Sequence, residues 1–338
     1  MTSADSGTTT APAGRRAVVT GAAGFIGSHL CEALLAAGWL VTGVDHLRGH
    51  PAEVCARNLR ALRPDPRFVL VRADLATAEL EPLLYGADTV FHLAARPGVR
   101  ASWGEDFAEY ADSNVLGTHR LLDAAGRAGV RRAVVSSSSS VYGGAEDGAT
   151  AESRLPAPLS PYGASKLMTE QLALAHARRP GAVTSMVALR YFTVYGPRQR
   201  ADMAITRMIE SAFTGRPFTV YGDGLQRRDF TFVSDAVRAN LLAADADARA
   251  VAVNTGSGEP VTVLELIRLV GEVVGRPVVY EHGPAADGDA RSTHADLTAA
   301  AKLLAYGPTV DLRTGLRRQA EWMRSAAAGP RTLQPVGG

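Results

Sequence analysis

The sequence predicts an α/β fold, in which a doubly wound parallel sheet carries a smaller, mixed α/β lobe. Short apolar runs alternate with helical stretches between residues 15 and 195, and such alternation needs crossover connections that produce a parallel sheet. The first apolar run ends at a glycine-rich turn. Beyond residue 195 the elements become shorter, and 338 residues exceed what one core usually holds. A second lobe is therefore expected there.

The expected elements follow in chain order. Each expected strand of the sheet is a short apolar run. These runs cover Arg16–Thr20, Leu40–Val44, Arg67–Val71, Thr89–Leu93, Arg131–Ser136 and Val183–Leu189. Helical stretches lie between them, from Ile26 to near Gly38 and over Ala52–Leu62, Phe107–Ala128 and Ser160–Arg178. In the second lobe we expect helices near Met203–Thr214 and Thr262–Val274, and strands around Phe218–Tyr221 and Asp229–Phe232.

These elements give a provisional division of the chain. Residues 15–195 are expected to form the large domain and residues 196–325 mainly the small lobe, with the chain able to cross between them more than once. Residues 1–14 are rich in Ser, Thr, Ala and Pro and lack the pattern of a signal peptide, so they are expected to be a disordered tail. Residues 326–338, rich in Gly and Pro, are expected to be a flexible tail.

Composition excludes several classes of function. The formal net charge is +2 with both signs interspersed, which argues against a nucleic-acid partner. No apolar run approaches the ~20 residues that span a bilayer, so no membrane partner is expected. Cys31 and Cys55 provide neither a disulfide framework nor a metal site, and the eight histidines form no ligand cluster. We therefore expect a cytoplasmic protein without a bound metal.

The glycine-rich turn predicts a dinucleotide site. Gly21 allows a sharp turn, Gly24 lets a pyrophosphate approach the backbone, and Gly27 lets helix and strand pack closely. The N-terminus of the following helix offers free N–H groups to the phosphates. Asp45 ends the second strand, where a carboxylate can accept hydrogen bonds from the ribose hydroxyls of the adenosine.

The choice of dinucleotide follows from charge. Asp45 would repel a 2′-phosphate, which favours NAD over NADP, although Arg48 lies nearby and keeps NADP open. Asp74 follows the third strand and would face the adenine. It could equally cap the helix that follows.

A tyrosine and a lysine four residues apart are candidates for catalysis. Tyr162 and Lys166 open the helix at Ser160–Arg178, and their spacing places both side chains on one helical face. A lysine ammonium beside a phenol lowers the phenol's pKa, which makes tyrosine a usable general base near neutral pH. The spacing alone is common. The serine-rich segment Ser136–Ser140 provides context, because it follows an apolar strand and would lie at the carboxyl edge of the sheet.

Taken together, these motifs resemble those of extended short-chain dehydrogenases of the nucleotide-sugar epimerase/dehydratase family. The resemblance covers roughly residues 15–325. It is carried by TGAAGFIG, HLAA at His92–Ala95, SSSSSVYG, YGASK, RYFTVYGPRQRADM at Arg190–Met203, GDG at Gly222–Gly224, RRDFTFVSD at Arg227–Asp235 and GDARSTHAD at Gly288–Asp296. It implies a Rossmann fold with a small substrate lobe, NAD as cofactor and a nucleotide-linked sugar as substrate. It also implies homodimers formed through two helices, those near residues 107–128 and 160–178.

The resemblance implies a role for individual residues. Tyr162 would be the base and acid at the sugar hydroxyl, Lys166 would bind the nicotinamide ribose, and Ser138 would hydrogen-bond the same sugar oxygen. Arg228 and Arg291 would grip the diphosphate, because a guanidinium suits forked contacts with phosphate. The residues implied in NAD binding are Gly21, Gly24, Phe25, Ile26, Gly27, Asp45, Asp74, Leu75, Leu93, Ala94, Ala95, Tyr162 and Lys166.

The reaction expected from the resemblance is 4-epimerisation through a 4-keto sugar. The 4,6-dehydratases carry Asp-Glu where this chain has Ser139 and Ser140, and the decarboxylases carry a glutamate at the latter position, so both reactions are disfavoured. Asp45 argues against reductases, which need NADPH. A non-catalytic NAD sensor is disfavoured because such proteins commonly lose the Tyr/Lys pair, which this chain retains.

The resemblance is greatest to UDP-glucuronate 4-epimerases. Phe-Thr-Val-Tyr-Gly-Pro followed by Arg-x-Asp-Met, with Arg100 upstream, carries it. Ser139, Ser140, Thr193 and Arg200 could bind a C6 carboxylate, although Arg200 could instead support the diphosphate. A UDP-glucose/UDP-galactose or N-acetylhexosamine 4-epimerase is the alternative. Departures from the family pattern at Arg96, Ala201 and Ser292 leave the size of the substrate open.

Overall fold

The computed structural model describes residues 14–144, 148–285 and 288–327. The two predicted tails therefore lie almost wholly outside the described residues. At the C-terminal end the last helix continues to Ala327, two residues beyond the predicted end of the ordered chain. Within the described ranges, no helix combines the length and the apolar sequence needed to cross a membrane.

A seven-stranded parallel sheet forms the large domain, which confirms the predicted fold class. The strands run in the order β11-β6-β5-β4-β1-β2-β3. The order reverses between β1 and β4, and ligands of doubly wound sheets bind at such a reversal, beyond the carboxyl ends of the strands. The strands are β1 (Arg16–Thr20), β2 (Leu40–Asp45), β3 (Phe68–Arg72), β4 (Thr89–His92), β5 (Arg132–Ser138), β6 (Ser185–Tyr191) and β11 (Ala250–Thr255).

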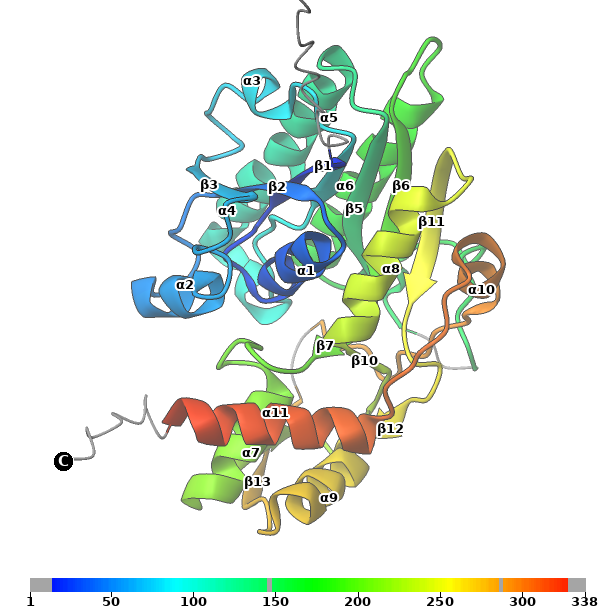
Figure 1. Ribbon diagram of the computed structural model, residues 1–338. Helices are drawn as coiled ribbons and strands as arrows, with labels where there is room; N and C mark the ends of the chain where they lie inside the picture. The colour runs from blue at the N-terminus through cyan, green and yellow to red at the C-terminus, as the bar shows by residue number, and fades with distance from the viewer. Residues whose placement is uncertain (1–13, 145–147, 286–287, 328–338) are drawn as a thin grey trace, which may run out of the picture.

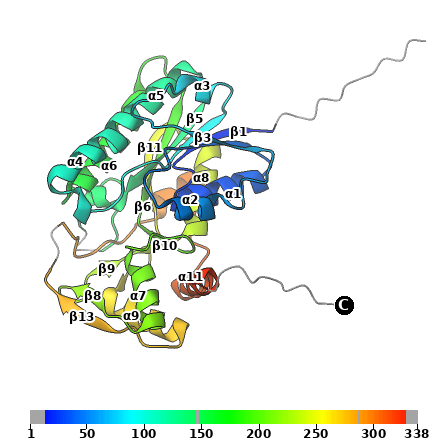
Figure 2. The same cartoon turned by 90° about the vertical axis from the view of Figure 1, so that its left-hand side faces the viewer.

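Helices cover both faces of this sheet. Figures 1 and 2 show α1 and α8 on one face and α5 and α6 on the other. The helices of the large domain are α1 (Phe25–Ala36), α2 (Ala52–Leu59), α3 (Glu81–Leu84), α4 (Phe107–Tyr110), α5 (Gly117–Arg127), α6 (Pro161–Arg178), α8 (Val233–Asp245) and α10 (Thr298–Leu304). Shorter turns are η1 (Arg100–Ser102), η2 (Gly104–Asp106), η3 (Ala111–Leu116) and η4 (Ser139–Tyr142).

The chain returns to the large sheet after its first visit to the small lobe. β11 pairs with β6 in parallel over Ala250–Thr255, and α8 packs against α1. Residues 233–255 therefore belong structurally to the large domain, although their sequence lies within the range expected to be mainly small lobe. Neither α8 nor β11 was among the elements expected from the sequence.

Within the described residues, the small lobe consists of three helices and short strand pairs. Its helices are α7 (Ala204–Thr214), α9 (Val263–Val274) and α11 (Leu312–Ala327). Its strands are β7 (Thr193–Tyr195), β8 (Phe218–Tyr221), β9 (Arg227–Arg228), β10 (Phe230–Phe232), β12 (Val261–Thr262) and β13 (Tyr280–Gly283). They pair as β10-β7, β12-β9 and β13-β8. Figure 2 shows the lobe below the carboxyl edge of the sheet, with α11 seen end-on.

Two apolar cores lie on opposite faces of the sheet. One gathers Val18, Val90 and Val135 with Leu121 and Leu122 under α5. The other begins under α1 and α8 and continues through the aromatic side chains of β7 and β10 into α7, α9 and α11. Because this second core is continuous, the two lobes bury apolar surface against each other, and burial of apolar surface is the main stabilising term in folding.

A buried ion pair fastens α6 to the sheet. Glu170 of α6 is fully buried, and both of its carboxylate oxygens accept hydrogen bonds from Arg190 of β6, at 2.6 and 2.8 Å. Ser137 of β5 donates to the same carboxylate at 2.8 Å. Arg190 also donates to Tyr142 Oη at 2.7 Å, and Tyr142 donates to Asn254 of β11 at 2.7 Å. The network therefore joins three strands, α6 and η4.

Removal of one partner from this ion pair should destabilise the protein strongly. For Arg190→Met we expect the free energy of unfolding in urea to fall by about 3–5 kcal/mol, because the Glu170 charge would be left buried and unpaired. Replacement of both partners, as in Glu170→Leu/Arg190→Met, should cost less than the single change. Arg268→Ala, which removes an exposed ion pair with Glu272, should change stability little. If Arg190→Met and Arg268→Ala lowered the free energy of unfolding equally, the assigned role of the Glu170–Arg190 pair would be contradicted.

Candidate active site

The glycine-rich turn lies at the carboxyl end of β1, next to the reversal in strand order. Gly21 adopts a φ of +72°, which favours glycine. A Cβ on Gly27 would lie 2.1 Å from the carbonyl oxygen of Gly21, so strand and helix approach too closely for any side chain there. Gly24 precedes the first residue of α1 and offers no side-chain cap. The first N–H groups of α1 are therefore available to a phosphate.

Two side chains hold this turn from opposite sides. The Ala23 N–H donates to Asp45 Oδ2 at 3.0 Å, and the Ala23 carbonyl accepts from Asn58 Nδ2 at 2.9 Å. Asp45 Oδ1 accepts from the Leu47 N–H at 2.8 Å. Asp45 thus holds the glycine-rich turn and the backbone just beyond β2. Asn58 was missed from the sequence because it lies within α2, where no motif singles it out.

Three further residues predicted to bind the cofactor, Asp74, Leu75 and Ala94, follow the ends of β3 and β4. Asp74 forms an ion pair with Arg48 at 2.6 Å and also accepts from the Ala76 N–H at 3.0 Å. Its carboxylate therefore caps a turn and not the following helix, which one of its two interpretations expected, because the next helix, α3, begins only at Glu81. The Ala94 N–H donates to Thr20 Oγ1 at 3.2 Å, directly beside Gly21. Leu75 is buried against Gly117.

His92 at the end of β4 forms hydrogen bonds with side chains of β1 and α5. Its Nδ1 lies 2.8 Å from Thr20 Oγ1 and its Nε2 lies 2.8 Å from Thr118 Oγ1. Burial, with a smaller contribution from the charge of Lys166, lowers the pKa of His92 to about 3. The imidazole is therefore neutral and bridges two hydroxyls, in agreement with a hydrogen-bonded residue at the end of a strand.

Helix α6 presents Tyr162 and Lys166 in its first two turns. Ser160 caps the helix by accepting from the Gly163 N–H at 3.1 Å, and proline occupies the first helical position. Lys166 is buried, and its Nζ donates to Ser136 Oγ at 3.2 Å. Burial lowers the pKa of Lys166 to about 8, although the carboxylate of Glu170, one turn along the same face, opposes this.

The positive charge that lowers the pKa of the Tyr162 phenol comes from a different residue than the sequence predicted. Burial raises the pKa of the Tyr162 phenol, whereas a hydrogen bond with Ser138 and the positive charge of Arg200 lower it. From the sequence, the lysine was expected to supply the charge that favours phenolate. In the structure the Lys166 ammonium contacts Ser136, and Arg200 is a positive charge that acts on the phenol.

A π-helical turn organises the other side of Tyr162. The sequence predicted one regular helix over 107–128, but η3 interrupts it with wider π-helical hydrogen bonding. Asn114 in this turn binds the backbone of Arg96 through both of its amide atoms, and it donates to Ser165 Oγ at 3.0 Å. Its backbone carbonyl oxygen accepts from the Thr169 hydroxyl at 2.8 Å. Asn114 therefore fixes α6 against the segment that follows β4, which periodicity alone could not reveal.

The polar residues predicted to face the sugar lie on β5, η4 and β7. Ser138 Oγ accepts from the Ser140 N–H at 3.1 Å, which holds the start of η4. Ser139 and Ser292 line a small cavity together with Phe192, which directly precedes Thr193. The structure thus places Ser138 in hydrogen-bond contact with Tyr162, and Ser139 and Ser140 follow Ser138 in η4.

The arginines predicted to bind substrate fall into two groups. Arg200 lies against Gly98 and close to Tyr110 and Tyr162, whose rings meet edge to face with centroids 6.3 Å apart. Arg100 lies elsewhere, stacked on Tyr221 and 3.1 Å from Asp289.

The second arginine group borders the small lobe. Arg228 lies close enough to Arg100 and Asp289 to feel both charges, and burial lowers its pKa. Arg291 binds Asp223 at 2.8 Å, and its backbone carbonyl accepts from the Arg227 N–H.

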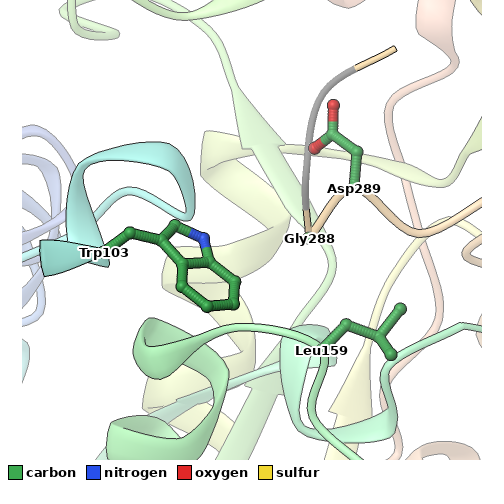
Figure 3. Close-up of a pocket in the computed structure, with 4 residues that line it drawn as sticks. All are labelled: Trp103, Leu159, Gly288 and Asp289. Carbon is green, nitrogen blue, oxygen red and sulfur yellow. The ribbon is translucent and has the colours of Figure 1, made fainter.

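A cavity of about 340 Å³ opens beside the second group. Figure 3 shows the Trp103 indole and the Leu159 side chain on either side of this cavity, with Gly288 and Asp289 on the segment above Leu159. An apolar wall beside several guanidinium groups suits a ligand that combines a ring with phosphates.

Comparison with known proteins identifies the family. Residues 17–256 match the model of the NAD dependent epimerase/dehydratase family. The chain belongs to this family. The glycine-rich turn after β1, and Tyr162 and Lys166 at the start of α6, agree with this identification.

Individual relatives cover almost the whole chain. An uncharacterized UDP-glucose epimerase, YtcB of Bacillus subtilis, is 41% identical over 315 residues, which are 92% of this chain and 99% of the relative. UDP-glucuronic acid 4-epimerase from Bacillus cereus, solved with UDP-glucuronic acid and NAD, is 40% identical with a TM-score of 0.87 and covers 92% and 99% of the two chains. MoeE5, solved with UDP-glucuronic acid and NAD, is 48% identical with a TM-score of 0.84 and the same coverage.

The residues present fit NAD as the cofactor of this enzyme. A Cβ on Gly27 would lie 2.1 Å from the Gly21 carbonyl oxygen, so no side chain fits there, and the Asp45 carboxylate lies beside this turn, where it accepts from the Ala23 N–H. Lys166 is a buried donor at the opposite end of the site.

We expect the affinity for NAD to fall at alkaline pH. The pKa of Lys166 is lowered to about 8, so the ammonium donor is present below that pH and is lost above it. The dissociation constant, measured by calorimetry between about pH 7 and about pH 9, should therefore rise through this range. Lys166→Met should bind NAD more weakly throughout and lose this step. An identical step in the variant would show that another group titrates.

Proposed function

We propose that this chain catalyses the NAD-dependent 4-epimerisation of a UDP-sugar, with UDP-glucuronate and UDP-galacturonate as the interconverted pair. The observation that carries the proposal is the position of Arg200 beside Tyr162 and apart from the arginines around Asp289. A cation at the sugar end of the site suits a carboxylate at C6. The family and the bound ligands of the B. cereus enzyme and MoeE5 support the same substrate class.

In this proposal the chain's own groups move one proton. Tyr162 takes the proton from the sugar 4-hydroxyl and later returns it, and Ser138 hydrogen-bonds the same oxygen. Lys166 holds the nicotinamide ribose from its buried position. When bound, NAD supplies an acceptor that takes hydride from C4 and gives it back. Inversion at C4 would require the sugar ring to turn in the site between the removal of the proton by Tyr162 and its return.

The polar residues around the sugar favour epimerisation over loss of water or CO₂. Dehydration needs an acid and a base beside the sugar, and this chain has the neutral hydroxyls of Ser139 and Ser140 at the positions where dehydratases carry carboxylates. A 4-keto uronate is a β-keto acid that loses CO₂ readily. Hydrogen bonds from Ser139, Ser140 and Thr193, together with Arg200, would hold its carboxylate and keep it from being expelled.

The alternative is a 4-epimerase for neutral sugars. It is favoured by the relationship to YtcB, which is named as a UDP-glucose epimerase. In that case Arg200 would contact a hydroxyl or a phosphate. The two candidates share every catalytic residue and differ in what Arg200 and the hydroxyls of Ser139, Ser140 and Thr193 bind.

A homodimer and a cytoplasmic location complete the proposal. Phe107, Leu116 and Met168 are exposed apolar side chains on α4, η3 and α6, the region expected to form the subunit interface. Burial of such side chains against a second copy would remove apolar surface from water. Cys31 and Cys55 are both free thiols, which suits a reducing compartment.

Product analysis by NMR tests the substrate directly. With NAD and UDP-glucuronate, the purified protein should form UDP-galacturonate to equilibrium, without release of CO₂ and without net reduction of NAD. Turnover of UDP-glucose alone would establish the neutral-sugar alternative. Formation of UDP-xylose or of a stable 4-keto product would contradict the argument from the serines.

Removal of the phenolic hydroxyl tests the assignment of the base. Tyr162→Phe should lower kcat by at least about 10²-fold, because general-base catalysis contributes about 10²–10⁴-fold. NAD binding, measured by calorimetry, should stay within about twofold of the unmodified protein, since the ring and its contact with Tyr110 remain. Retained turnover would remove Tyr162 from the mechanism.

A further inference from the structure

Arg200 is held by a forked contact with Asp202, a residue with no role assigned so far. Nε of Arg200 donates to one carboxylate oxygen of Asp202 at 2.9 Å, and Nη2 donates to the other at 2.5 Å. Two parallel hydrogen bonds fix both the position and the plane of a guanidinium. They leave the Nη1 donors of Arg200 outside the fork.

The two partners lie at different depths. The Arg200 side chain is 23% exposed, whereas the Asp202 side chain is 64% exposed. Nη2 of Arg200 lies 3.9 Å from the Cβ position of Gly98, whose carbonyl accepts from Tyr110, and Tyr110 packs against Tyr162. The guanidinium therefore lies at the site and the carboxylate lies at the solvent edge. Asp202 holds the arginine from outside.

The backbone around this pair is anchored at both ends. Gln199 is buried and binds Val194, Thr206 and Gln319. The Met203 N–H donates to the Arg200 carbonyl at 3.2 Å, and α7 begins at the next residue. Arg200 and Asp202 therefore project from a fixed turn. The long arginine side chain is the part left to be ordered, and the fork with Asp202 supplies that order.

We propose that Asp202 is a positioning residue that makes the site selective for an acidic sugar, because it holds Arg200 in the orientation that receives the C6 carboxylate. This inference rests on the proposed function. The charge of Asp202 is largely in water, where screening weakens its repulsion of the substrate carboxylate. The gain in orientation of Arg200 therefore outweighs the repulsion.

The test is the kinetics of Asp202→Asn on two substrates. Asparagine keeps one acceptor but turns an N–H₂ group toward the second donor, so the fork is lost. We expect KM for UDP-glucuronate to rise about tenfold with kcat within about threefold, and KM for UDP-glucose to stay within about twofold. Calorimetry should give the same loss of affinity for UDP-glucuronate.

Asp65→Asn is the matched control. Asp65 forms the same fork with Arg67, two residues away, at 2.7 and 3.0 Å, in the loop before β3. This pair lies at the end of the sheet opposite the site, and its loss should change neither KM.

A double-variant cycle tests whether Asp202 acts through Arg200. If it does, Asp202→Asn should have little further effect in an Arg200→Ala background. The inference would be overturned if Asp202→Asn raised KM for UDP-glucuronate equally with and without Arg200, or if it raised KM for UDP-glucose by the same factor. A lower KM for UDP-glucuronate in Asp202→Asn would also overturn it. Failure of the unmodified protein to bind or turn over UDP-glucuronate would instead overturn the proposed function.

Discussion

The arrangement of the site depends on the buried ion pair between Glu170 and Arg190. Helix α6 carries Tyr162 and Lys166, and Glu170 lies one turn beyond Lys166 on the face turned to the sheet. Because a buried carboxylate is stable as an ion only when it is paired, α6 has one favourable position over β5 and β6. The same network reaches Tyr142, and so fixes η4 with Ser139 and Ser140. The positions of α6, which carries Tyr162 and Lys166, and of η4 therefore both depend on this one ion pair.

At the glycine-rich turn, too, polar side chains hold neighbouring segments together. The peptide of Ala23 is held by Asp45 on one side and Asn58 on the other, so the turn is shaped before any ligand binds. At the opposite end, Asn114 in the π-helical turn joins α6 to the loop after β4. In each case one polar side chain connects two segments that the sheet brings together.

The sequence predicted most of what local spacing can encode. The glycine turn, Asp45, the Tyr162/Lys166 spacing and the alternation of strands with helices all depend on neighbours within a few residues or on a repeated pattern, and the family confirmed the class of enzyme. What was missed depends on distant partners. Glu170 meets Arg190 twenty residues away, and Tyr142 meets Asn254 after 112 residues. The π-helical turn was also missed, because the sequence predicted one regular helix through this region.

The return of the chain to the sheet sets the order in which this protein can fold during synthesis. β6 ends at Tyr191, but its outer partner β11 is not complete until Thr255 has left the ribosome. Until then the hydrogen-bonding edge of β6 is open, and an unpaired edge strand invites pairing with other chains. Pairings between parts of the chain this far apart form slowly. The large domain thus remains vulnerable to aggregation until part of the small lobe has also been made.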